Sequence, residues 1–135
     1  MYANILVAVA PEPGHDTARA IEAARTLRAE GGKITLLSVV EAVPPYIEQY
    51  LPEGQLEKNI EEVRTALKAD SGGVKDLGIE VVSGPAGATI TEYAAANGID
   101  LIVLSSHRPG LQDYFLGSTA ARVVRHAPCS VHVLR

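Results

Sequence analysis

The chain has almost no aromatic residues. Its 135 residues include five Tyr, one Phe and no Trp, so aromatics make up 4%. Proteins that bind single-stranded nucleic acid stack the bases on aromatic side chains, and this shortage argues against that function. A formal net charge of −4 also argues against a protein that binds the phosphate backbone, so we expect no nucleic-acid partner.

Cysteine is equally scarce. Cys129 is the sole cysteine, which excludes an internal disulfide and leaves too few thiolates for a zinc or iron–sulfur site. The four histidines lack the i, i+4 spacing of metal ligands on a helix, so we expect no metal held by the protein alone. Mg²⁺ brought in by a nucleotide stays an open alternative, because it needs few protein ligands.

Long hydrophobic runs are absent. The first apolar run, Ile5–Ala10, is six residues long and follows no basic segment, so it is too short for a signal peptide or a membrane span. We therefore expect a cytoplasmic protein with no membrane partner. With 47% hydrophobic and 21% charged residues, the composition is typical of one globular domain over residues 1–135.

Short apolar segments alternate with helical patterns along the chain. Strands are expected at Ile5–Ala10, Ile34–Val40, Ile79–Val82, Leu101–Leu104 and Val131–Leu134. Helices are expected between them, on apolar stripes that begin at Ala20, Leu56, Ile90 and Ala120. This alternation predicts an α/β fold: a single doubly wound, five-stranded parallel sheet flanked by about four helices, similar to a Rossmann fold.

Details of the pattern give three finer expectations. Gly31-Gly32 is expected to end the first helix, and the second stripe runs on to Leu77 with a break at Gly72-Gly73. His132 interrupts the last apolar segment, which predicts an edge strand. The long connection Glu41–Gly54, with its prolines, is expected to be an irregular loop in which two tyrosines either cover a pocket or simply pack.

Parallel sheets of this kind bind ligands beyond the carboxyl ends of their strands. Here Ser105–Gly110 follows a buried strand, and Gly117-Ser118 opens a helix. Free N–H groups at a helix start, with Ser118 as N-cap and Arg108 and His107 as charged donors, suit a phosphate. The plainer alternative is that Gly117-Ser118 only caps the helix and Arg108 is solvated, and the spacing alone does not separate the two.

Charge is unevenly distributed along the chain. Residues 41–62 contain six Glu and one Lys, a net charge of −5. Residues 105–135 contain four Arg and one Asp, a net charge of +3 before histidines are counted. A small anionic ligand is therefore compatible with an acidic protein.

The chain resembles the universal stress proteins. The likeness spans essentially the whole chain. It is carried by Ile5–Val9 and Ile34–Val40, and it is strongest in Ser106–Gly110, Leu116–Ser118 and Val123–Val131. The resemblance implies the adenine nucleotide alpha hydrolase-like fold, a homodimer paired through the last strand (residues 129–135), and ATP or another adenine nucleotide as ligand. The implied role is in the stress response.

Position by position, the resemblance assigns nucleotide contacts to Ala8, Ala10, Val39, Leu104, Ser105, His107, Arg108, Gly110, Gly117, Ser118 and Thr119. In the family's ATP-binding branch the motif is Gly, two residues, Gly, nine residues, then Gly-Ser or Gly-Thr. Ser105 stands where the first Gly is expected, and either Arg108 or Gly110 stands near the second. Only six residues separate Gly110 from Gly117, so the loop is a variant.

The clearest departure from the family is Ala10, where nucleotide binders usually have Asp. The loss of a charged hydrogen-bond partner leaves two further hypotheses open. One is a dimeric interaction module that binds no nucleotide, and the other is an enzyme that acts on a phosphorylated metabolite through His107 and Arg108. No catalytic residue is assigned, because no carboxylate is placed as an evident general base, and ATP hydrolysis is expected to be slow at most.

Overall fold

The computed structural model describes residues 1–10, 17–41, 44–70, 76–105 and 117–134. Strands and helices alternate along this part of the chain. The elements are β1 (Tyr2–Ala8), α1 (Thr17–Leu27), β2 (Arg28–Val40), α2 (Pro45–Glu48), α3 (Gln55–Asp70), β3 (Leu77–Ser83), α4 (Ala86–Ala96), β4 (Leu101–Ser105), α5 (Ser118–His126) and β5 (Ser130–Leu134). The five strands form one parallel sheet in the order β3-β2-β1-β4-β5, which confirms the predicted fold class.

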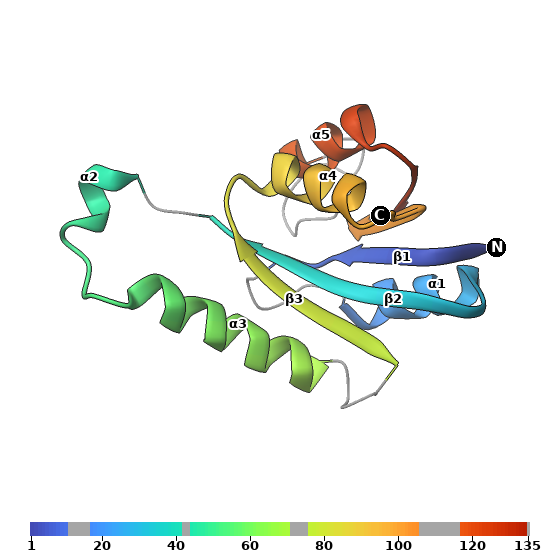
Figure 1. Ribbon diagram of the computed structural model, residues 1–135, viewed down its shortest axis with the longest axis horizontal. Helices are drawn as coiled ribbons and strands as arrows, with labels where there is room; N and C mark the ends of the chain where they lie inside the picture. Colours follow the sequence, from blue (N-terminus) through green and yellow to red (C-terminus); the bar gives the residue numbers. More distant parts are fainter. Residues whose placement is uncertain (11–16, 42–43, 71–75, 106–116, 135) are drawn as a thin grey trace.

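Helices cover both faces of the sheet (Figure 1). One apolar cluster joins the sheet to α1 and α3 through Ile5, Val7, Leu36 and Val103. The other joins it to α4 and α5 through Leu6, Leu37, Ile102 and Leu104. Successive residues of β1 thus belong to opposite clusters, as the alternation of side chains along a strand requires. A strand buried on both faces explains the unbroken apolar run at its start.

Several of the predicted boundaries are wrong, and the first strand spans Tyr2–Ala8 in place of the predicted Ile5–Ala10. Gly31-Gly32 lies inside β2 and does not end α1, which stops at Leu27. The pairing of β1 with β2 is irregular between Tyr2 and Asn4, and Gly31 takes up the irregular backbone with a φ of 77°. Leu77 does not continue α3, since it opens β3, where it pairs with Ile34 and is buried in the core.

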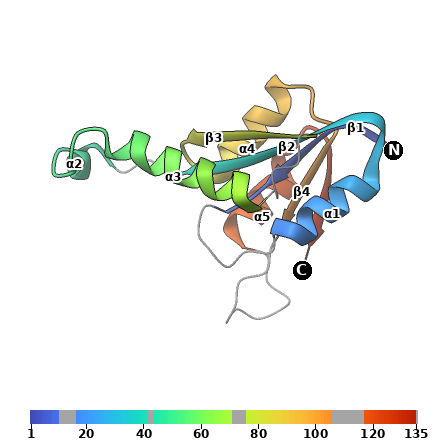
Figure 2. The same ribbon diagram turned by 90° about the horizontal axis from the view of Figure 1, so that it is seen from below.

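The connection after β2 contains a helix that the sequence pattern did not predict. α2 is a single turn with Pro45 at its start, and it lies well away from the sheet (Figures 1 and 2). Tyr46 and Tyr50 are exposed there by 68% and 80%, so neither packs in the core. By contrast, β5 lies at the edge of the sheet, as His132 predicted.

Hydrogen bonds to Asp100 hold the amino end of β1 beside β4. Its carboxylate accepts from the backbone N–H groups of Ala3 (2.9 Å) and Asn4 (3.0 Å). The Asn4 side chain in turn donates to the carbonyl oxygen of Asn97 at 2.9 Å. These contacts join residues more than 90 positions apart and fix the register of β1 at the edge opposite to the carboxyl ends of the strands.

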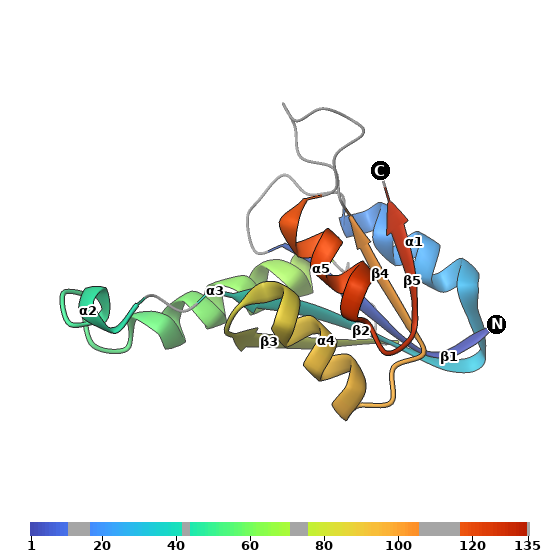
Figure 3. The same cartoon turned by 90° about the horizontal axis from the view of Figure 1, so that it is seen from above.

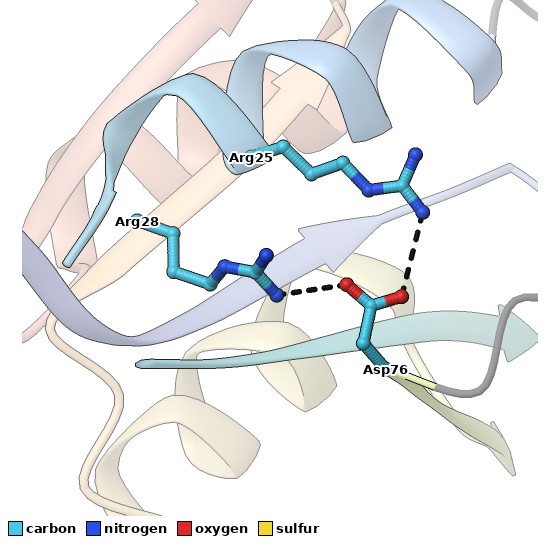
Figure 4. Close-up of polar contacts among 3 residues, drawn as sticks. All are labelled: Arg25, Arg28 and Asp76. Carbon is cyan, nitrogen blue, oxygen red and sulfur yellow. Dashed lines mark hydrogen bonds and ion pairs between the residues drawn. The ribbon is translucent and has the colours of Figure 1, made fainter. Parts of the chain in front are cut away.

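An ionic cluster ties the start of β3 to α1 and β2 (Figure 4). Asp76 accepts a hydrogen bond from Arg28 at 2.9 Å and lies 3.5 Å from Arg25. The hydrogen bond from Arg28 is the main reason that the pKa of the Asp76 carboxyl lies below its usual value, and the charge of Arg25 adds to it. All three side chains are partly exposed, so this cluster adds little stability.

The lowered pKa of Asp76 gives a prediction for the pH dependence of stability. A carboxyl whose pKa is depressed by folding stabilises the protein above its unfolded pKa, and this stabilisation is lost as pH falls through the folded pKa. We expect Asp76→Asn to lower the Tm slightly at pH 7 and to lower it less at about pH 3, because the carboxyl begins to be protonated as pH falls below its unfolded pKa. Equal Tm differences at both pH values in thermal denaturation followed by circular dichroism would contradict this.

Candidate ligand site at the carboxyl edge of the sheet

The chain reverses its direction of winding between β1 and β4. The β1–α1–β2 unit proceeds toward one edge of the sheet, and the β4–α5–β5 unit proceeds toward the other. β1 and β4 are nevertheless neighbours, paired from Ile5–Leu101 to Ala8–Leu104. A crevice outside the carboxyl ends of the strands forms at such a switch point, because the two connections leave in opposite directions.

Three of the sequence-assigned residues meet on one face at this edge. Ala8 pairs with Leu104 on one side and with Leu37 on the other, and Val39 lies two residues further along β2. Ala8, Val39 and Leu104 all belong to the apolar cluster on the side of α4 and α5. Val39 and Leu104 are buried and Ala8 is half-buried, so they form an aliphatic floor. Ala10 lies two residues past the end of β1 and is also half-buried.

The backbone of Val39 is directed toward the end of β1. The N–H of Val9 donates to the carbonyl oxygen of Leu37 at 2.8 Å, so Leu37 turns its backbone groups toward β1. Backbone groups on a strand alternate in direction, and those of Val39 therefore point the same way as those of Leu37. The backbone groups of Val39 lie beyond the hydrogen bond from Val9 to Leu37, which is the last one described between β1 and β2. A ligand at this edge can therefore reach them.

The amino end of α5 supplies donors at the same edge. The first helical hydrogen bond runs from the N–H of Ala121 to the carbonyl oxygen of Gly117 at 2.9 Å. The preceding N–H groups, those of Ser118, Thr119 and Ala120, consequently have no acceptor within the helix. With the positive end of the helix dipole, these groups favour an anion.

The residue at the N-cap differs from the prediction. Gly117 is the N-cap, with extended backbone (φ −62°, ψ 158°), and Ser118 is the first residue of the helix. Within the part of the chain that the structure describes, no side chain caps the helix. A Cβ atom on Gly117 would lie within 4 Å of no atom of the described residues, so nothing there covers the helix start.

The remaining residues assigned to the nucleotide from the sequence are Ser105, His107, Arg108 and Gly110. Ser105 is exposed at the carboxyl end of β4, paired with Leu134 of β5. His107, Arg108 and Gly110 lie outside the described residues, so their assignment to the phosphates stays a prediction.

The packing of α5 on α4 depends on a contact that sequence reasoning missed. A Cβ atom on Gly87 would lie 2.6 Å from Cδ and 3.1 Å from Cβ of Arg122. The stem of Arg122 therefore crosses α4 at this glycine, and no larger residue fits without a shift. Gly87 is the second residue of α4, but its position in the sequence does not say which side chain approaches it. This contact positions the helix whose amino end forms the site.

Two further observations concern other chemistry. Burial raises the pKa of the Cys129 thiol, so the thiol is protonated at neutral pH, as expected of a small packed residue and not of a redox sensor. Among the described residues, no three His, Cys, Asp or Glu side chains gather into a metal-binding group, and no helix is long and apolar enough to cross a membrane.

Comparison with known proteins gives a consistent result. Residues 1–135 match the universal stress protein family. The chain is 34% identical to universal stress protein A homolog 2 of Coxiella burnetii, over 99% of this chain and 95% of that protein. It is also 30% identical to a universal stress protein of Thermus aquaticus, over the full length of both.

Solved structures agree with this match. The universal stress protein UspA of Lactobacillus plantarum has a TM-score of 0.78 and 28% identity, over 99% of this chain and 98% of that one. A universal stress protein in complex with cAMP has a TM-score of 0.61 and 22% identity, over 99% and 97% of the two chains. The second comparison bears on the fold alone.

Proposed function

Since this chain belongs to the universal stress protein family, we propose that it binds ATP or a related adenine nucleotide at the carboxyl edge of its sheet and acts in the stress response. The observation that carries the proposal is the uncapped amino end of α5 beside the switch point between β1 and β4. That a protein of the same fold is in complex with cAMP supports an adenine nucleotide as the ligand class.

The proposed binding mode follows from the two halves of the site. The N–H groups of Ser118 and Thr119 hold phosphate oxygens, with Gly117 leaving room for the approach. The aliphatic floor of Ala8, Val39 and Leu104 holds the adenine, and the backbone of Val39 hydrogen-bonds its edge. Because Tyr46 and Tyr50 are exposed and α2 lies away from the sheet (Figure 1), the base is held by aliphatic and backbone groups.

We further propose that the protein is a homodimer joined through β5. β5 forms an outer edge of the sheet and pairs only with β4 among the described strands. An edge strand can extend its sheet by pairing with the same strand of a second copy. We assign no catalytic residue and expect ATP turnover to be slow. Mg²⁺ is expected to arrive with the nucleotide phosphates, which supply most of its ligands.

Thermal stabilisation tests the proposal. Nucleotide at 100 times its Kd stabilises the folded protein by about 2.7 kcal/mol, which corresponds to a rise in Tm of about 10 °C for a domain of this size. We expect millimolar ATP to raise the Tm, and GTP to raise it less. No shift in Tm with any adenine nucleotide at millimolar concentration would contradict the proposal.

Ala10→Asp is expected to strengthen nucleotide binding. The half-buried Ala10 lies two residues past the end of β1, where the family's binders usually carry a carboxylate. A hydrogen bond to a charged group contributes about 1.5–3 kcal/mol, so we expect Kd for ATP to fall by about tenfold to a hundredfold in isothermal titration calorimetry. Ala10→Asn, which has the same size as the Asp variant without the charge, is the matched control. An unchanged Kd for Ala10→Asp would contradict the proposed position of the adenine.

Ala10 itself favours a second candidate function. A member of this family that lacks the carboxylate could act as a dimeric interaction module without a nucleotide. The two functions differ in what the purified protein carries. Mass spectrometry of the supernatant after denaturation should detect an adenine nucleotide at a substantial molar fraction under the first proposal and none under the second.

A further inference from the structure

Large hydrophobic side chains of the described residues are exposed in few places. Apart from Met1, they are Val124 on α5 and four residues of the segment around α2, namely Tyr46, Ile47, Tyr50 and Leu51. We call residues 44–57, which include α2 and the first turn of α3, the acidic arm. A cluster of this kind on a segment that projects from the domain is typical of an interaction surface.

The acidic arm joins apolar exposure to negative charge. It contains three Glu and no Lys or Arg. Glu53 and Glu57 are exposed, and neither forms an ion pair with another described residue. In all three views of the molecule, α2 lies at the far end of the projecting segment, away from the sheet (Figures 1, 2 and 3). The arm therefore carries exposed tyrosines and, at Glu53 and Glu57, carboxylates without an ion partner among the described residues.

The outer face of α5 has the complementary character. Residues 118–126 contain two Arg and no acidic residue. Arg122 and Arg125 are exposed without an ion partner among the described residues, and Val124 is 46% exposed. Ala121 lies next to both Val124 and Arg125, at spacings of three and four residues along the helix. Ala121 and Val124 therefore form an apolar strip on α5, with Arg125 beside it.

From this complementarity we infer that the acidic arm docks on the outer face of α5 in a second copy of this chain. The two surfaces have opposite charge, and each has an apolar centre, as protein interfaces with polar rims do. They cannot meet within one chain, because α2 and α5 lie far apart in every view (Figure 3). This contact is separate from pairing through β5, since it uses a helix face and a projecting segment in place of a strand edge.

Sedimentation velocity on the purified chain tests this inference. Arg125→Glu should weaken the association about tenfold, because like charges then face each other across the contact. Lys33→Glu changes the net charge by the same amount at an exposed position of β2, and should leave the association unchanged. Raising the salt from about 0.05 M to about 0.5 M should also weaken the association.

Two further variants complete the test. Tyr46→Ser with Tyr50→Ser removes the apolar centre of the arm and should also weaken association about tenfold, with the fold checked by circular dichroism. Adding Glu57→Arg to Arg125→Glu should restore association to within about threefold of the unaltered chain, because the charges are exchanged. If none of these variants changes the association measured by sedimentation velocity, the inference is overturned. A loss of ATP affinity in the tyrosine variant without a change in sedimentation would also overturn it, since the arm would then cover the ligand site of its own chain.

Discussion

Gly117→Asp should abolish most nucleotide binding while leaving the fold intact or slightly more stable. A carboxylate at the N-cap accepts hydrogen bonds from the first N–H groups of α5, which a glycine cannot do, so the free energy of unfolding should rise by a few tenths of a kcal/mol. The same carboxylate repels the phosphates. A pair of like charges 4 Å apart costs about 1 kcal/mol in water and about 4 kcal/mol in partly buried surroundings, so we expect Kd to rise by about a hundredfold.

Gly117→Asn separates charge from bulk in this experiment. Asn is as good an N-cap as Asp and nearly the same size, but it has no charge. The φ of Gly117 is −62°, which either Asp or Asn can adopt without strain. The difference in Kd between the Asp and Asn variants, measured by titration calorimetry, therefore reports the repulsion of the phosphates alone. Equal affinities for ATP in both variants would show that the phosphates do not lie at the start of α5.

Ile102→Ala should cause a large loss of stability. Ile102 lies on β4 between β1 and β5, is fully buried, and packs in the cluster under α4 and α5. Its truncation removes apolar contacts and leaves a cavity that a central strand cannot close, at a cost of about 3–4 kcal/mol. The total stability of a domain is about 5–15 kcal/mol, so much of it would be lost.

Urea denaturation followed by circular dichroism measures this loss. Ile102→Val removes a single methylene group and should cost about 1 kcal/mol, which makes it the matched control. A loss below about 1.5 kcal/mol for the Ala variant would mean that the two helices close the cavity, contrary to the packing described here.

Local pattern was enough to predict the layers of this fold, because the strands are buried on both faces. The runs around Ile5, Leu36 and Ile102 are continuous in the sequence for that reason. Leu77 was placed in a helix because it fits the phase of the preceding apolar stripe, and only its pairing with Ile34 makes it a strand residue. Tyr2 was missed because Asp100, far away in the sequence, holds the amino end of β1.

The candidate site was predicted less evenly. Ala8, Val39 and Leu104 carry no chemical signature of their own, and the family resemblance named them; strand register then brings them together. Gly117 was recognised, but its role as N-cap depends on backbone angles that its neighbours do not specify. The contacts of Gly87 with Arg122 and of Asp76 with Arg28 join separate elements, so neither follows from local sequence.

Backbone NMR shifts during a titration with ATP test the central claim most directly. Nucleotide binding at the proposed site predicts the largest ¹H–¹⁵N shifts at Ala10, Val39, Gly117, Ser118 and Thr119, which lie at the carboxyl edge of the sheet and the start of α5. It predicts no shifts at Asn4, Gly98 or Asp100, which lie at the opposite edge. Saturable shifts confined to that opposite edge, or none at millimolar ATP, would contradict the account.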